Sequence, residues 1–118
     1  MNIEETIEKY LTEKQDVIKP IMVKLLSLLS PVATKKGYDK PIKKRGDDGD
    51  EYYFINKENN EFVMVSLYNQ NDPDDEDEPE IWVSWGRGDV KKNGKFDFAG
   101  SANDYYDSDT LKNIKKAF

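Results

Sequence analysis

Apolar side chains occupy both alternating sets of positions between residues 51 and 68, EYYFINKENNEFVMVSLY. This pattern predicts two β-strands that pair as a hairpin. Asn59 and Asn60 are expected to form the turn, because asparagine tolerates the positive φ that a tight two-residue loop requires. That loop would place Phe54 opposite Val65.

The two faces of this predicted hairpin are both apolar. One face carries Tyr52, Phe54, Val63, Val65 and Leu67. The other carries Tyr53, Ile55, Phe62, Met64 and Tyr68, around Ser66. A strand with one face in water alternates apolar with polar residues, and this hairpin does not. One face is therefore expected to pack against helices, and the other to be covered or offered to a partner.

Apolar residues at helical spacing predict helices ahead of this hairpin. A first amphipathic helix is expected over residues 2–14, opened by a capping box. A second helix begins near Asp16 and carries a wider apolar stripe, formed by Val17, Ile18, Ile21, Met22, Leu25, Leu26, Leu28 and Leu29. Ser30 and Pro31 resemble the start of a new helix, which predicts a short extra turn that stops at Gly37.

Shorter patterns predict the remaining strands. Tyr38–Lys44 is expected to form an edge strand, where Pro41 is tolerated. Alternation from Ile81 predicts a strand that runs through Val90 across a bulge at Gly86 or Gly88.

Asn93 and Gly94 are expected to form the turn that joins the two strands of the last hairpin. Phe96 and Phe98 are expected on one face, and that face also carries Val83 and Trp85 if the bulge preserves the alternation. Asn103–Asp109 resembles a turn-rich linker, and a final helix is expected over Thr110–Ala117, capped by Asp107 or Ser108.

The predicted fold is α+β. A four- or five-stranded, mostly antiparallel sheet would have N-terminal helices and a C-terminal helix packed mainly on one face. The 118 residues suit a single domain, residues 1–118, with helices in 1–37, the sheet in 38–100 and the last helix in 107–118.

The composition excludes several kinds of chemistry. The chain has no His and no Cys, which excludes disulfides, thiolate nucleophiles and His-based catalytic triads. No nucleophile–base pair and no glycine-rich phosphate loop is present, so an enzyme, a bound cofactor and a metal centre are not expected. No signal peptide or membrane-spanning stretch is apparent, and a cytoplasmic protein without membrane contact is the expectation.

The charge is distributed unevenly along the chain. The net charge is −6, but residues 51–118 alone carry 15 acidic and 8 basic side chains. Seven of the nine residues from Asp72 to Glu80 are acidic. Nucleic acid is not expected as a ligand, because binding to phosphate requires Lys and Arg along the binding face. Acidic surface instead favours a basic protein partner.

These features lead to a first hypothesis, a small acidic interaction module that binds and neutralises a basic protein. An immunity protein against a nuclease-type toxin is one concrete form, because such a toxin carries a cationic nucleic-acid site. Acidic and aromatic side chains are the candidate partner-binding residues: Asp72, Asp74, Asp75, Glu76, Asp77, Glu78, Glu80, Trp82, Tyr53, Phe62 and Tyr68.

Two alternatives remain open. A small-molecule or Ca²⁺-binding module could use the sheet face, or Asp72, Asp74 and Glu76 at alternate positions. An EF-hand loop, however, requires Gly at its sixth position and Glu at its twelfth, where this chain has Asp77 and Val83. The other alternative is a soluble structural domain without a ligand.

Overall fold

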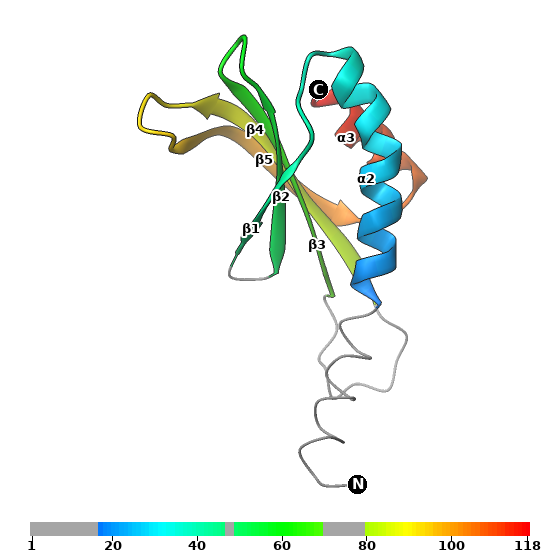
Figure 1. Ribbon diagram of the computed structural model, residues 1–118. Coiled ribbons are helices and arrows are strands. Elements are labelled where there is room, and N and C mark those ends of the chain that lie inside the picture. Colours follow the sequence, from blue (N-terminus) through cyan, green and yellow to red (C-terminus); the bar gives the residue numbers. More distant parts are fainter. Residues whose placement is uncertain (1–16, 47–48, 70–79) are drawn as a thin grey trace, which may run out of the picture.

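The computed structural model describes residues 17–46, 49–69 and 80–118, and places two helices on one face of a five-stranded sheet (Figure 1). The strands are antiparallel and follow one another in the order β1-β2-β3-β4-β5. The elements are α2 (Ile18–Lys35), β1 (Ile42–Arg45), β2 (Asp50–Asn56), β3 (Glu61–Asn69), β4 (Ile81–Val90), β5 (Phe96–Tyr105) and α3 (Ser108–Lys116). The α+β prediction is confirmed. A single helix precedes the sheet in the described residues, and the helix predicted over residues 2–14 lies outside them.

Helix α2 continues through Pro31, so the predicted break at Ser30 is wrong. A proline inside a helix removes one backbone hydrogen bond. Leu29 and Ala33, on either side of Pro31, are both buried, and their packing holds the two halves of the helix on the same layer. Ser30 does not cap a new helix; its hydroxyl donates to the carbonyl of Leu26 (2.7 Å).

The predicted stop at Gly37 is confirmed. Gly37 has φ +88°, and its N–H donates to the Thr34 carbonyl at 3.1 Å. The N–H of Tyr38 donates to the Ala33 carbonyl at 2.9 Å, which completes a Schellman motif. Tyr38 is therefore buried beneath the helix, and the predicted edge strand begins only at Ile42.

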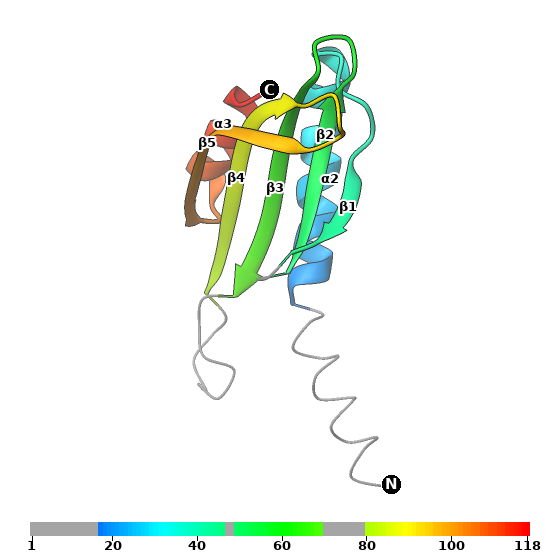
Figure 2. The same ribbon diagram turned by 90° about the vertical axis from the view of Figure 1, so that its left-hand side faces the viewer.

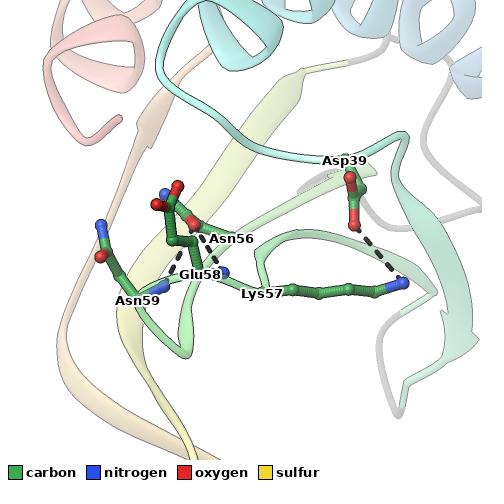
Figure 3. Close-up of polar contacts among 5 residues, drawn as sticks. All are labelled: Asp39, Asn56, Lys57, Glu58 and Asn59. Atoms are coloured by element: carbon green, nitrogen blue, oxygen red, sulfur yellow. Dashed lines mark hydrogen bonds and ion pairs between the residues drawn. The ribbon is translucent and has the colours of Figure 1, made fainter.

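The hairpin of β2 and β3 has a longer turn than predicted. Asn56 pairs with Glu61, which leaves four residues in the loop. The side-chain oxygen of Asn56 accepts the N–H groups of Glu58 and Asn59 at 3.1 and 3.2 Å, and Asn60 adopts φ +55° (Figure 3). Asn56 thus begins an Asx-type turn, and the first strand of the hairpin ends two residues earlier than it would with a two-residue loop.

The register is consequently shifted by two residues, and Phe54 lies opposite Val63 rather than Val65. A shift of two keeps every side chain on its predicted face, because side chains alternate with a period of two. The turn is also fixed to the helical layer, since the amide nitrogen of Asn56 donates to the Lys36 carbonyl (3.4 Å). The nearby ion pair of Lys57 and Asp39 (3.6 Å, Figure 3) joins two exposed side chains and adds little stability.

The core forms two separate clusters, one on each face of the sheet. The larger lies between the sheet and the helices, and consists of Met22, Leu25, Leu29, Ala33, Tyr38, Phe54, Val63, Val65, Leu67, Val83 and Ile114. The smaller lies on the opposite face, called here the second face, and consists of Tyr53, Phe62 and Met64 with Ile55, Val90 and Phe96 packed against them.

The second face is covered at one end by the sheet itself. The β4–β5 hairpin curls across that face in front of β3 and β2 (Figure 2). Gly88 and Gly86 permit this close approach. A Cβ at Gly88 would collide with the backbone of Asp97, and a Cβ at Gly86 would come 2.9 Å from the ring of Phe98.

The irregularity that accompanies this curl lies in β5 rather than in β4. Arg87 pairs with Gly100 and Gly88 with Phe98, so Ala99 is the extra residue. Strand β4 therefore keeps its regular alternation. Phe98, opposite Gly88, faces away from Val83, so the bulge does not preserve the alternation that would have placed both on one face.

Strand β5 is longer than predicted. Asn103–Tyr105, expected in a linker, pairs with Trp82–Ser84 and extends the sheet to residue 105. Helix α3 follows, and the predicted cap is confirmed: Asp107 accepts the N–H of Thr110 at 2.8 Å. Neither described helix combines the length and apolar character needed to span a membrane.

Candidate protein-interaction site

Three of the predicted binding residues, Tyr68, Glu80 and Trp82, lie at the end of the sheet where β3 ends and β4 begins. Strand β3 ends at Asn69 and β4 begins at Ile81. The side-chain oxygen of Asn69 accepts the N–H of Glu80 at 3.3 Å.

Tyr68 pairs directly with Trp82 across the two strands. Strand alternation puts both side chains on the same face as Phe62 and Met64, the second face. Figure 2 shows that the curled β4–β5 hairpin crosses the other end of the sheet.

An aromatic pair with an attached carboxylate forms the centre of this site. The rings of Trp82 and Tyr105 lie 4.6 Å apart between centroids, at an angle of 39°. The Trp82 indole N–H donates to a carboxylate oxygen of Glu80 at 2.8 Å. Trp82 is half-buried, whereas Tyr105 is 50% exposed. We call these three residues the Glu80–Trp82–Tyr105 cluster.

The hydrogen bonds in this cluster favour the charged form of Glu80 and the neutral form of Tyr105. Those that Glu80 accepts from Trp82 and from Tyr105 lower the pKa of the Glu80 carboxyl. The hydrogen bond that Tyr105 donates to Glu80, together with the negative charge of that carboxylate, raises the pKa of the Tyr105 hydroxyl. At neutral pH Glu80 is therefore an anion held against two rings, and Tyr105 keeps its proton.

This combination suits a cationic side chain. A lysine or arginine from another protein can lie on an exposed aromatic ring and reach a carboxylate at the same time. Neighbouring polar groups extend the surface, because Asn103 donates from its amide to the hydroxyl of Tyr68 (3.4 Å).

Tyr53 and Phe62 do not belong to this surface. Their exposed fractions are 5% and 0%, so the expectation that they lie on an open aromatic face is wrong. The curled hairpin buries them. Phe96 stacks on Tyr53 with centroids 4.2 Å apart, and the Phe98 ring lies 4.9 Å from that of Phe62. The ammonium of Lys44 lies 4.6 Å from the Phe96 centroid and closes the far side of the cluster.

The acidic candidates Asp72, Asp74, Asp75, Glu76, Asp77 and Glu78 lie outside the described residues. They nevertheless account for most of the negative charge in the second half of the chain. Without them, the described residues from 51 onward hold nine acidic and eight basic side chains, for a net charge of −1. The described part of the second half is thus nearly neutral, and the charge asymmetry comes from the segment that joins β3 to β4.

Two residues of the site, Tyr105 and Asn103, are not among the binding residues that the sequence predicts. The turn-forming residues around them indicate a linker. Their role follows from the length of β5, which the pairing with β4 determines.

No group of three or more Asp or Glu side chains suited to holding a metal ion occurs among the described residues. Comparison with protein-family models, curated proteins and solved structures finds no match to this chain.

Proposed function

We propose that this chain is a small cytoplasmic interaction module that binds and neutralises a basic protein. Binding would use the Glu80–Trp82–Tyr105 cluster together with Tyr68, and the carboxylates between Asp72 and Glu78 would supply long-range attraction. An immunity protein against a nuclease-type toxin is the concrete form we favour, because the nucleic-acid site of such a toxin is cationic.

The observation that carries this proposal is the Glu80 carboxylate, held by the indole of Trp82 at 2.8 Å beside the half-exposed ring of Tyr105. A carboxylate fixed before binding loses little conformational freedom when a cation arrives. Aromatic residues and arginine are also the side chains most often found at the energetic centres of protein interfaces.

The acidic run adds a second contribution that depends on salt. Six carboxylates belong to the segment between Asn69, which follows Tyr68, and Glu80, which belongs to the cluster. Charges on such a segment accelerate the encounter with a cationic surface, and salt screens this effect.

The first test is a pull-down from the native cells at increasing salt, with the wild-type chain and two charge-matched variants. Glu80→Gln removes the fixed carboxylate. Glu58→Gln removes one charge from the turn at the opposite end of β3, and serves as the control (Figure 1). We expect one basic protein whose retention falls with salt, and whose affinity for Glu80→Gln is weaker by about tenfold. Equal retention by the two variants would contradict the role of Glu80.

A second pair of variants tests the aromatic surface. Tyr105→Ala removes the half-exposed ring and is expected to weaken binding of the same basic protein by about tenfold or more. Val23→Ala removes exposed apolar surface from α2, where Val23 is 67% exposed, and is expected to leave binding unchanged. If no salt-sensitive basic protein is retained by the wild-type chain, the proposed function is wrong.

A further inference from the structure

The two edges of the sheet differ strongly in their suitability for pairing with another strand. Strand β1 is four residues long, follows Pro41 and carries Lys43, Lys44 and Arg45. Short, lysine-rich edges discourage the addition of a further strand. Strand β5 has ten residues, contains no Lys, Arg or Pro, and is exposed at every position from Asp97 to Tyr105.

The open backbone groups of β5 can be located from its pairing with β4. The N–H of Tyr106 donates to the Ile81 carbonyl at 3.0 Å. In an antiparallel ladder, every second residue directs its N–H and C=O to the neighbouring strand. Asp104, Ala102 and Gly100 therefore point to β4. Ser101 and Asn103 direct their backbone groups away from the sheet, where Figure 2 shows β5 as its outer edge.

This open stretch has defined ends. The next outward N–H, that of Tyr105, is taken by the side chain of Asp104 at 2.7 Å. At the other end the extra residue Ala99 interrupts the regular ladder. Between them lie the small residues Gly100, Ser101 and Ala102, which leave the backbone accessible from both faces.

The charge along this edge indicates which kind of strand it accepts. Residues 96–111 contain Asp97, Asp104, Asp107 and Asp109 but no Lys or Arg. Asp97 is already paired with Lys91 (3.3 Å), but the other three have no ion pair within the described residues. A second copy of β5 would bring carboxylates toward carboxylates, which disfavours self-pairing.

We propose that β5 binds an extended, lysine- or arginine-rich segment of the partner as a sixth strand, through the backbone groups of Ser101 and Asn103. Side chains of the added strand that face the same way as Tyr105 then reach the Glu80–Trp82–Tyr105 cluster, so the edge supplies affinity and the cluster selects cations. This inference rests on the proposed function, because it specifies the form in which the basic partner is recognised.

The test uses the full chain and a synthetic probe, an end-capped peptide of five Lys-Val repeats. Binding is followed by the backbone amide signals in NMR and by Trp fluorescence. We expect the signals of Ser101 and Asn103 to shift and their hydrogen exchange to slow. A peptide of five Glu-Val repeats is expected to bind more weakly by about tenfold or more. Equal binding of the two peptides, or shifts confined to other elements, would overturn the proposal.

Two further arms separate backbone pairing from side-chain contact. Ser101→Pro removes an outward N–H that β4 does not use, and is expected to abolish binding of the lysine peptide, whereas Ser101→Ala keeps that N–H and binding. If Ser101→Pro fails to fold, a lysine peptide N-methylated at alternate residues serves with the wild-type chain. Undiminished binding of that peptide contradicts strand addition.

The native basic protein distinguishes failure of this inference from failure of the proposed function. Loss of its binding in Glu80→Gln but not in Ser101→Pro leaves the proposed function standing and rejects the edge as the site. Dimerisation of the wild-type chain that Ser101→Pro abolishes would show that β5 pairs with a second copy, and would likewise overturn the proposal.

Discussion

Gly88 lies directly against the backbone of Asp97, so closely that a methyl group at Gly88 would collide with the Asp97 carbonyl. This contact is where the β4–β5 hairpin turns across the second face of the sheet. It permits Phe96 and Phe98 to cover Tyr53 and thereby divides that face into a sealed part and an open part.

The first prediction concerns this contact. Gly88→Ala is expected to lower the free energy of unfolding by about 2–4 kcal/mol, because backbone has to move to accommodate the new methyl group. Gly100→Ala is the matched control on the neighbouring strand, where a Cβ meets nothing within 4 Å; its effect is expected to stay within about 0.5 kcal/mol. Urea denaturation measures both. Equal stabilities of the two variants would show that the hairpin does not pack as described.

The second prediction concerns the turn between β2 and β3. Asn56 is 4% exposed and makes three hydrogen bonds, to Lys36, Glu58 and Asn59. Asn56→Ala is expected to lower the free energy of unfolding by about 2–4 kcal/mol, because it removes all three hydrogen bonds and leaves backbone groups unpaired. Asn59→Ala removes an exposed side chain and is expected to cost less than about 0.5 kcal/mol. Thermal unfolding followed by circular dichroism compares them, and a cost for Asn59→Ala that matches Asn56→Ala would reject the assigned turn.

The third prediction concerns the proline within α2. Pro31→Ala is expected to raise the free energy of unfolding by about 1–3 kcal/mol, because alanine restores a backbone hydrogen bond and is the best helix former. Pro20→Ala is expected to have a much smaller effect, because Pro20 lies in the first turn, where N–H groups have no partner within the helix. Denaturant unfolding of both variants measures the difference. A destabilised Pro31→Ala would mean that the proline is needed for the shape of the helix.

The fourth prediction concerns pH. Burial of Tyr53, together with the charge of Glu51 and the hydrogen bond to it, raises the pKa of the Tyr53 hydroxyl from 10.0 to about 12. The folded state therefore holds this proton more tightly than the unfolded state. The corresponding stability is complete below pH 10 and is lost as the pH rises toward about 12.

Denaturant unfolding across that interval compares wild type with Tyr53→Phe. The stability advantage of the wild type is expected to shrink between pH 10 and about 12, because phenylalanine has no proton to lose. A constant difference across the interval would show that Tyr53 titrates normally.

Local sequence patterns predict part of the candidate site. Glu80, Trp82 and Tyr68 were predicted as binding residues, and the structure brings them to the same end of the sheet. Tyr105 was missed, since its own neighbours resemble a linker and only the pairing with β4 shows that it lies in a strand. Tyr53 and Phe62 were expected to be exposed, because nothing local reveals that a distant hairpin folds over them.

The sequence by itself determined the α+β class, the end of α2 at Gly37 and the face on which each side chain of the central hairpin lies. These depend on periodicity and on residues whose backbone preferences are strong. The tertiary structure alone decided the register of that hairpin, the position of the extra residue Ala99 and the division of the second face. These depend on which strands meet and how closely they approach, and contacts between residues far apart in the chain are not encoded in any single stretch of it.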